Sequence, residues 1–449
     1  MHGLDVRIQK LNIALPPLEI YRRLRPQFDA SFMLESAVGQ SKTVAYSFLG
    51  FSPSLVLRSE DGEVKGGMGH QADSPERYLS DLLRKSFVPC DRFPFAGGLV
   101  GYFSYEFARQ AEPSLPSLPS EFPEFELGLY RECLIYDHSS FQVFHLSIGE
   151  GGELLEAVGS MDEAAGSEFR AEEPRPLSSK ESFEEGVGAI KERIRDGETF
   201  QTVLSRRLQV PYRGDLLNLY STLRSLNPSP YMFFLDFGER TVLGSSPETL
   251  LTVRGREATT FPIAGTRPLG GCVTERRRLR EDLLSDEKER AEHAMLVDLA
   301  RNDLSKVCVG GSVSVPDYMR VEEFSHVQHI VSKVNGTLQD DRTAAEALAA
   351  VFPAGTVSGA PKPRAMEIIQ EVEGVSRGPY AGAVGYLSFN GNLDSAITIR
   401  SAFAADGRLY LQAGAGIVAD SDPGREFEET EHKLASMRAA LRLASEVPA

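Results

Sequence analysis

Tryptophan is absent from this chain of 449 residues, and cysteine is scarce. The four cysteines, Cys90, Cys133, Cys272 and Cys308, show no CxxC pair and no metal-ligand spacing. The sequence therefore supports neither a disulfide framework nor a zinc site. Free thiols are typical of a reducing compartment, so we expect a cytoplasmic protein.

Long hydrophobic runs are also missing. No segment approaches the roughly 20 apolar residues that a membrane-spanning helix needs. Residues 1–19 contain no apolar core of signal-peptide length. We therefore expect no membrane association.

Positive charge is in deficit, with 48 basic against 64 acidic residues and a formal net charge of -16. A nucleic-acid surface needs a clustered basic face. The one dense basic run, residues 274–282, is interleaved with acids, and we interpret it as a solvated helix face. We expect no nucleic-acid partner.

What the chain does contain is an ordinary globular composition, with 41% hydrophobic and 25% charged residues. Short apolar or alternating runs between turn residues predict strands, and apolar positions at helical spacing predict helices. The expected strands cover residues 43–51, 54–59, 97–107, 127–137, 141–148, 200–210, 231–237, 240–246, 248–254, 322–338, 381–391, 394–407 and 408–418. The expected helices cover residues 74–87, 179–198, 279–307, 343–352 and 422–444. Runs of strands broken by helices predict an α+β fold rather than a regular βαβ alternation.

One stretch of the chain has no sustained apolar period. Residues 149–182 are rich in Gly, Glu, Ser and Pro, which predicts a connecting segment. It separates an N-terminal region, residues 1–160, from a second region, residues 183–449. No internal repeat is visible.

Two pairs of glutamates have helical spacing. Glu289 with Glu292, and Glu426 with Glu429, lie at i and i+3, so each pair shares one helix face. A single pair is typical of a solvated acidic face. Two pairs that converge from separate helices would offer the hard oxygen ligands that suit Mg²⁺. Lys433, at i+4 from Glu429, forms either an ordinary ion pair or a contact to an anionic ligand near the metal.

Two polar side chains stand in apolar, strand-like segments. His329 is there either as a hydrogen-bonded core histidine or as a general acid or base. Arg400 requires an anion or another polar partner if it is buried.

Three segments with small residues are candidate ligand loops. Residues 353–364 superficially resemble a phosphate loop, but the Gly-Lys-Ser/Thr ending is missing and Pro361 removes an amide donor, so we reject a nucleotide site. Residues 413–418 either present backbone amides to a ligand or form a strand bend. Residues 261–271 are a simple turn, a phosphate cradle, or the floor of a site in which the small size of Ala264 matters. No cysteine lies in a Gly-x-Cys-x-Gly elbow, so the chain shows no glutaminase nucleophile.

Eleven ordered motifs together resemble one family, the chorismate-utilising enzymes, and within it the large subunits of anthranilate synthase. They lie at residues 200–207, 227–234, 244–251, 261–268, 291–304, 324–336, 352–369, 378–386, 397–403, 412–423 and 426–433. The resemblance runs from about residue 30 to residue 440 and is strongest from residue 183 onward. It implies two face-to-face antiparallel β-sheets with helices packed outside and an active-site cleft between the sheets. It also implies an Mg²⁺-dependent lyase that converts chorismate and ammonia to anthranilate and pyruvate in tryptophan biosynthesis.

The resemblance assigns roles by position. Glu292 and Glu429 would ligate Mg²⁺, Glu289 and Glu426 would hold its waters or add ligands, and the metal would bind the ring carboxylate of chorismate. The residues that would grip or lie near the substrate are Gly265, Ala264, Thr356, Tyr380, Arg400, Gly414, Ala415, Gly416 and Lys433. Glu248 would be the acid that assists departure of the C4 hydroxyl, and His329 would assist proton removal and pyruvate loss. Thr266 and Gln201 complete the implied catalytic set.

Two positions separate members of the family. Gln201 occupies the site at which water-adding relatives carry a basic lysine, and a glutamine cannot deprotonate water. Ala264 occupies the site at which many aminodeoxychorismate synthases carry a lysine that attacks the ring. The resemblance therefore implies that free ammonia attacks C2, although some aminodeoxychorismate synthases share this pair.

The N-terminal region would supply the tryptophan-binding element. Residues 32–36 resemble that element, and Glu35, Ser36, Pro230, Tyr231 and Met232 would form the inhibitor pocket. Ammonia would come from a separate glutamine amidotransferase subunit, so we expect a hetero-oligomer. Two alternatives stay open, an aminodeoxychorismate synthase large subunit of the folate pathway and a non-catalytic tryptophan-binding relative.

Overall fold

The computed structural model describes residues 5–36, 46–67, 74–149, 151–163, 167–324 and 327–446. Their strands pair antiparallel in two large sheets, and the first sheet has 13 strands within these ranges. Its main order is β1 (Val6–Leu11), β9 (Gln142–Ile148), β8 (Glu132–Asp137), β3 (Tyr46–Phe51), β2 (Ser31–Glu35), β13 (Tyr231–Asp236), β14 (Arg240–Ser246), β23 (Ser401–Ala405), β24 (Arg408–Ile417), β12 (Gln201–Gly214) and β10 (Phe169–Ala171). Strands β11 (Arg175–Pro176) and β20 (Gly359–Ala360) also pair with β12.

The second sheet has 11 strands within the same ranges. Its order is β17 (Ile263–Pro268), β19 (Val327–Thr337), β16 (Glu257–Thr260), β15 (Thr249–Arg254), β22 (Leu393–Ile397), β21 (Ala383–Ser388), β6 (Gly98–Phe103), β7 (Phe125–Tyr130), β4 (Leu55–Glu60) and β5 (Glu63–Lys65). Strand β18 (Ser314–Glu323) pairs with β19.

The two sheets pack face to face around a shared apolar core. Phe32 and Phe233 of the first sheet belong to the same buried cluster as Leu99 and Tyr130 of the second. The rings of Phe32 and Tyr130 meet edge to face with centroids 4.6 Å apart. Such a pair contributes about 0.5–1.5 kcal/mol beyond its buried area. The predicted α+β sandwich is confirmed.

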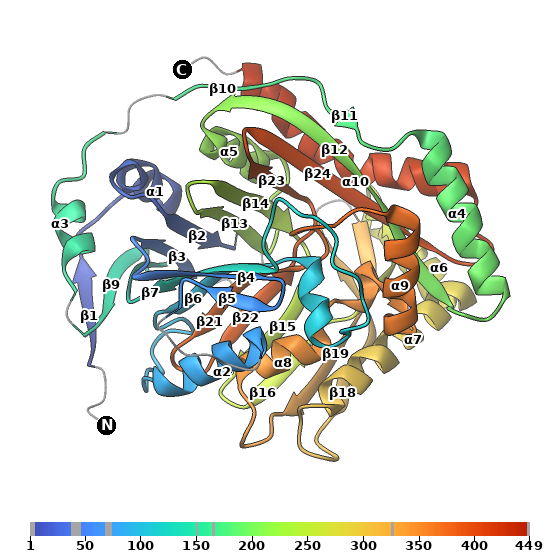
Figure 1. Cartoon of the computed structure of the whole chain (residues 1–449), viewed down its shortest axis with the longest axis horizontal. Coiled ribbons are helices and arrows are strands. Elements are labelled where there is room, and N and C mark those ends of the chain that lie inside the picture. Colours follow the sequence, from blue (N-terminus) through green and yellow to red (C-terminus); the bar gives the residue numbers. More distant parts are fainter. Residues whose placement is uncertain are drawn as a thin grey trace.

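Helices cover the outer faces of the sandwich (Figure 1). They are α1 (Pro17–Leu24), α2 (Pro75–Lys85), α3 (Glu153–Gly159), α4 (Lys180–Arg195), α5 (Leu216–Leu226), α6 (Val273–Ser285), α7 (Glu287–Ser305), α8 (Ala344–Val351), α9 (Lys362–Glu373) and α10 (Pro423–Glu446), with short 3-10 helices η1 (Arg25–Gln27), η2 (Tyr105–Gln110) and η3 (Gly355–Val357). Helices α1, α5 and α10 bury Ile20, Tyr220 and Leu434 in a second apolar core on the outer face of the first sheet. Helix α7 packs on β17 and β19, and α8 packs on β15.

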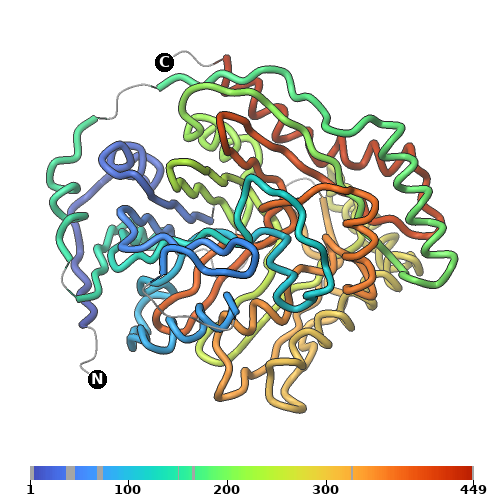
Figure 2. Tube along the Cα trace, in the orientation of Figure 1, coloured from blue at the N-terminus to red at the C-terminus, as the bar shows by residue number. Residues whose placement is uncertain are grey.

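Both regions expected from the sequence contribute strands to both sheets. Strand β2 of the N-terminal region pairs with β13, and β6 pairs with β21. Figure 2 shows the blue and cyan N-terminal segments lying among segments from beyond residue 200. The expected connecting segment carries α3, β10 and β11, and residues 172–179, which lead from β10 to α4, are mostly exposed (Figure 1).

Five expected elements are divided in the structure. The strand expected over residues 97–107 is β6 followed by η2, and the strand expected over residues 322–338 comprises the end of β18 and β19. The helix expected over residues 279–307 is two helices, because Asp286 ends α6 and its carboxylate caps α7 by accepting hydrogen bonds from the amides of Lys288 and Glu289. The strand expected over residues 127–137 is divided into β7 and β8, and the strand expected over residues 394–407 is divided into β22 and β23. In each case the chain leaves one sheet and enters the other. Period-2 alternation is the same in either sheet, so the sequence pattern does not reveal such a crossing.

The basic run at residues 274–282 lies on α6 and is largely exposed, as expected. Among the described residues, no helix is long and apolar enough to span a membrane.

Candidate active site

The candidate site forms where strands cross from one sheet to the other. Glu248 lies between β14 and β15, and Arg400 lies between β22 and β23. The two crossings are adjacent, because the Ile397 amide donates to the Glu248 carbonyl over 3.0 Å. Tyr380 precedes β21, which pairs with β22. Residues that are far apart in sequence thus meet where the chain passes between the two sheets.

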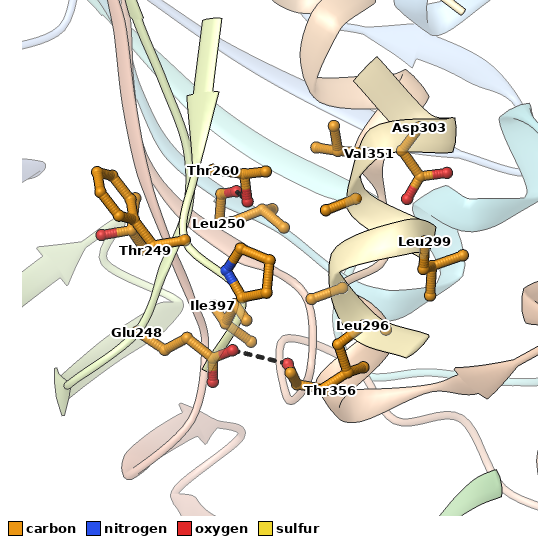
Figure 3. Close-up of a pocket in the computed structure, with 15 residues that line it drawn as sticks. Glu248, Thr249, Leu250, Thr260, Leu296, Leu299, Asp303, Val351, Thr356 and Ile397 are labelled. Atoms are coloured by element: carbon orange, nitrogen blue, oxygen red, sulfur yellow. Dashed lines mark hydrogen bonds between the residues drawn. The ribbon is translucent and has the colours of Figure 1, made fainter. Parts of the chain in front are cut away.

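Glu248 is held by Thr356, whose hydroxyl donates to Oε1 over 2.8 Å (Figure 3). Protein surrounds the carboxyl, although part of the side chain is exposed to an adjoining cavity. Burial raises the pKa of Glu248 to about 7, against the opposing effects of the Thr356 hydrogen bond and the Lys433 charge. Near neutral pH, much of this carboxyl is therefore protonated and able to donate a proton.

His329 lies on β19 with its ring against the turn that contains Gly265. Nδ1 is 2.9 Å from the Gly265 carbonyl and 3.1 Å from the Thr266 hydroxyl. A carbonyl only accepts, so Nδ1 carries the proton and Nε2 has the free lone pair. Burial lowers the pKa of His329, the Gly265 hydrogen bond opposes this, and the charge of Arg400 lowers it further. At neutral pH the ring is consequently a neutral base.

Gly265 makes this arrangement possible. Its φ is 64°, and the pairing of β17 with β19 shifts register between Ala264 and Thr266. A glycine adopts this conformation without strain, and the resulting bulge turns its carbonyl toward His329. Residues 261–271 therefore form a bulged strand and turn beside the site.

The four glutamates come from α7 and α10 and face a common region. Gln201 donates from Nε2 to Glu292 Oε1 over 3.1 Å. Burial raises the pKa of Glu292, the Gln201 hydrogen bond opposes this, and repulsion from Glu289 and Glu429 raises it further. The pKa of Glu426 is also raised, by burial first and then by Glu429 against the hydrogen bond from Ser421. Carboxylates from two helices thus interact electrostatically, which is the convergence that spacing alone did not show.

Each of these carboxylates has a partner in this structure. Arg267 binds Glu289 at 3.0 Å, and Lys433 binds Glu429 at 2.7 Å. Within the described ranges, no three His, Cys, Asp or Glu side chains are already arranged around a metal position. The donor set of four hard carboxylates nevertheless fits Mg²⁺, and a cation would relieve the repulsion that raises the pKa of Glu292.

A cradle for an anion lies beside the glutamates. Arg400 has φ of 53°, donates from Nη1 to the Lys433 carbonyl over 3.0 Å, and forms no ion pair with any carboxylate of the described residues. Burial lowers its pKa, although Tyr380 and Glu429 oppose this. Lys433 Nζ donates to the Gly414 carbonyl over 2.8 Å. Two cationic side chains therefore lie at the end of β24.

One edge of β24 is unpaired at that end of the strand. The pairing with β23 stops at Leu411, whereas the pairing with β12 continues to Ile417, so one edge of β24 has no strand beside it among the described residues. A Cβ on Gly414 would lie 2.9 Å from the Tyr380 hydroxyl, and one on Gly416 would lie 2.5 Å from Gln201 Nε2. These glycines let Tyr380 and Gln201 approach the strand, and Ala415 lies between them. Burial raises the pKa of Tyr380, so its hydroxyl is neutral.

The residues expected to form an inhibitor pocket lie around the pairing of β2 with β13. Glu35 is opposite Met232, and it accepts hydrogen bonds from Tyr220 at 2.8 Å and Arg224 at 3.0 Å. The Tyr231 hydroxyl instead reaches toward the second sheet, where it contacts Asp394 at 2.9 Å.

Glu35 and Tyr231 thus point to opposite faces of the first sheet. Ser36, after β2, and Pro230, before β13, are both half-buried. Residues 37–45, which follow Ser36, lie outside the described residues.

Two arginines that support the site were not identified from the sequence. Arg267 binds Glu289 together with Asp282 and Asp286, at 2.7 and 2.9 Å. The only signal for it was its place beside the turn at residues 261–266.

Arg377 is almost fully buried and binds Glu373 in a bidentate pair. It also donates to the carbonyls of Val357 and Val203, which joins the segments that carry Thr356 and Gln201, and its guanidinium lies 5.7 Å from the centre of the Tyr380 ring. An arginine three residues before Tyr380, in the Ser-Arg-Gly sequence, was the available signal.

Known proteins resemble this chain in both sequence and fold. A family model described as chorismate binding enzyme matches residues 70–439. Anthranilate synthase component 1 of Methanothermobacter marburgensis is 45% identical over 436 residues, which cover 96% of this chain and 94% of that protein. The crystal structure of anthranilate synthase component I from Streptococcus pneumoniae TIGR4 has a TM-score of 0.80 at 34% identity and covers 96% of this chain and 99% of its own. The menaquinone-specific isochorismate synthase of Escherichia coli, at 20% identity, a TM-score of 0.75 and coverage of 98% and 95%, shares the fold.

The matches extend across almost the whole chain, and the family model includes every motif that forms the cleft. The residues that meet at the strand crossings all lie within it. The chain therefore belongs to the family of chorismate binding enzymes.

Proposed function

We propose that this chain is the large subunit of an anthranilate synthase, a lyase that converts chorismate and ammonia to anthranilate and pyruvate. The observation that carries the proposal is the absence of a basic side chain at the two positions that distinguish the family. Gln201 is an amide bound to Glu292, and Ala264 ends at Cβ. Neither residue can deprotonate water or attack the ring, so the nucleophile must enter from outside the chain.

The anion cradle would hold the enolpyruvyl carboxylate. Arg400 has charge that no carboxylate of the described residues neutralises. The open edge of β24 offers the backbone amides of Gly414 and Gly416, whereas the amide of Ala415 faces β12. Tyr380 adds a neutral hydroxyl donor. Charge-assisted hydrogen bonds of this kind fix a carboxylate in orientation as well as in place.

Glu248 and His329 would divide the proton transfers. Hydroxide is a poor leaving group, so loss of the C4 hydroxyl requires an acid, and the raised pKa of Glu248 keeps that acid protonated near neutral pH. His329 is neutral, with Nε2 free to take the ring proton at C2 as the product becomes aromatic. Thr266 and the Gly265 carbonyl orient the imidazole.

The glutamates would hold Mg²⁺, with Glu292 and Glu429 as ligands and Glu289 and Glu426 around its waters. When bound, the ion supplies positive charge that stabilises the ring carboxylate. Arg267 and Lys433 neutralise Glu289 and Glu429 in the present arrangement. Lys433 would then be released from Glu429 to face the substrate.

We further propose that ammonia comes from a separate glutamine amidotransferase subunit and that L-tryptophan inhibits through the element around Ser36. The relatives are named as component 1 of anthranilate synthase, which implies a second component. Glu35 is buried with Arg224 and Tyr220, so a ligand that displaced one of these partners would disturb the pairing of β2 with β13.

One experiment tests the assignment. The purified chain is incubated with chorismate and Mg²⁺, with either ammonium or glutamine as nitrogen source, and the product is identified by mass spectrometry. We expect anthranilate and pyruvate with ammonium and no turnover with glutamine. A product that retains its enolpyruvyl group would instead identify an aminodeoxychorismate synthase subunit, and no turnover would identify a non-catalytic relative.

A further inference from the structure

A cavity adjoins the candidate site behind Glu248. Its walls come from the start of β15, the end of β16, one face of α7 and the segment around η3 (Figure 3). Of the residues expected to bind or convert chorismate, Glu248 and Thr356 alone line it. Arg400, His329 and Ala264 do not line it. The hydrogen-bonded pair of Glu248 and Thr356 is therefore shared by the proposed substrate site and this cavity.

Besides the hydroxyls of Thr249 and Thr260, the polar side chains of the cavity lie at its ends. Glu248 and Thr356 are at one end, and Asp303 is at the other (Figure 3). Asp303 is buried and already paired, with Lys362 at 2.7 Å and Lys306 at 3.0 Å. The remaining wall is mostly apolar.

The contents of the cavity follow from its size and lining. It has room for a few water molecules and not for a substrate with two carboxylates. Water needs two to four polar partners, and the oxygens of Glu248, Thr249, Thr260 and Asp303 supply them. An anion would face the carboxylates of Glu248 and Asp303, with the charge of Lys362 already taken by Asp303.

We propose that this cavity receives the water released from C4 of the substrate. The inference rests on the proposed function, in which the C4 hydroxyl departs beside Glu248. As nitrogen bonds to C2, the ring double bonds shift and the C4–O bond breaks with its electron pair on oxygen. That oxygen takes the Glu248 proton and becomes neutral water, and the proton that the attached nitrogen gives up restores Glu248 over the turnover.

The location distinguishes the released water from the attacking ammonia. Ammonia attacks at C2, on the side of Ala264, which does not line the cavity. The cavity meets the site at Glu248, on the side of C4. A neutral molecule produced at Glu248 can move into this space without crossing the anion cradle, so it no longer stands beside the carbon that it left.

The test fills the cavity from α7. Ala300→Leu adds three carbon atoms to the wall, and Ala300→Ser is the matched control that keeps the space and adds a hydroxyl. We expect Ala300→Leu to lower kcat at saturating ammonium by about tenfold or more, which corresponds to about 1.4 kcal/mol in the barrier. The KM values for chorismate and ammonium should change less than about twofold, and Ala300→Ser should resemble the wild type.

A second variant approaches from the opposite wall. Ala354→Val precedes η3, has extended backbone angles that a β-branched residue tolerates, and should lower kcat in the same way. Circular dichroism and melting temperature establish that each variant is folded. The two substitutions touch different elements, so a common loss of kcat would come from the lost space.

The outcomes are distinct. A raised KM for ammonium with unchanged kcat would overturn the inference and assign the cavity to the entering nucleophile. Wild-type kinetics in folded Ala300→Leu and Ala354→Val would also overturn it. A high-resolution crystal structure of the wild-type chain should show ordered water bonded to Glu248 within the cavity, and a dry cavity would refute the proposal. The crystal structure needs no turnover. A chain that makes no anthranilate would therefore refute the proposed function, while the ordered water in the cavity would still be tested by the crystal structure.

Discussion

Replacement of Thr356 should shift the basic limb of the pH profile, and replacement of its partner Glu248 should remove that limb. The pKa of Glu248 is raised to about 7, so the acid form is about 90% populated at pH 6, about half at pH 7 and about a tenth at pH 8. His329 must be neutral and its pKa is lowered, so activity rises with pH at the acidic end. We expect a bell-shaped profile of kcat/KM whose basic limb is centred near pH 7.

Thr356→Val removes the hydroxyl that stabilises the ionised form of Glu248. A hydrogen bond to a charged group contributes about 1.5–3 kcal/mol, and about 1.4 kcal/mol corresponds to one pH unit. The basic limb should therefore move upward by about one to two pH units. Thr356→Ser keeps the hydroxyl and should leave the midpoint in place, while Glu248→Gln should lose about 10²–10⁴-fold in kcat and lack this limb.

The assay is a continuous measurement of anthranilate formation with saturating ammonia across pH 5–9. The pH midpoint of the basic limb does not depend on the amount of active enzyme. It also does not depend on the affinity for chorismate, so Thr356 variants that bind chorismate more weakly can be compared with the wild type. A basic limb that stays in place in Thr356→Val, or that persists in Glu248→Gln, would refute the assignment of Glu248 as the acid.

Stability gives an independent check on the same group. A carboxyl whose folded pKa is raised from 4.5 to about 7 contributes stability that is complete below pH 4.5 and is lost as the pH rises through 7. The full shift corresponds to about 3 kcal/mol, and contact of the side chain with the cavity reduces this to about 1–2 kcal/mol. Urea unfolding at pH 5 and pH 8 should show most of this loss in the wild type and not in Glu248→Gln.

Three further predictions follow from other parts of the site. Excess chelator should abolish activity and added Mg²⁺ should restore it, whereas full activity in chelator would exclude the metal. Glu429→Gln should lose at least about a hundredfold in kcat/KM at an unchanged melting temperature. L-tryptophan should inhibit the wild type, and Ser36→Phe, which fills the proposed pocket, should relieve inhibition and retain turnover; calorimetry that finds no tryptophan binding to the wild type would exclude the pocket. Ala264→Lys should slow ammonia-dependent turnover and trap an adduct with chorismate detectable by mass spectrometry, because a tethered amine within roughly 3–3.5 Å would compete for the same carbon. An unchanged rate without an adduct would show that residue 264 does not face the reacting carbon.

Much of the fold follows from local sequence pattern. Alternation of apolar residues predicts strands such as β13 and β14, and helical spacing predicts α4, α8 and α10, because each element must bury one face. The same pattern did not reveal that β7 and β8 lie in different sheets, or that β22 and β23 do. The pleat alternates in the same way in both sheets, so the crossing is set by packing between them.

The candidate site shows the same division. Residue types and their spacing already show which chemical groups are present. Two glutamate pairs at helical spacing, an arginine in an apolar strand and a small residue at position 264 are all visible without coordinates, and the ordered motifs are enough to indicate the family.

Which of these groups meet, and in which protonation state, depends on how the chain packs in space. The helical spacing of Glu289 and Glu292 does not show that Glu429 raises the pKa of Glu292, because that repulsion acts between α7 and α10. The acid form of Glu248 at neutral pH likewise comes from burial at a crossing between two sheets and from Thr356, 108 residues away along the chain. Residue types are written in the sequence one position at a time, whereas burial and charge interaction depend on distances through space, which exist only once the two sheets have packed together.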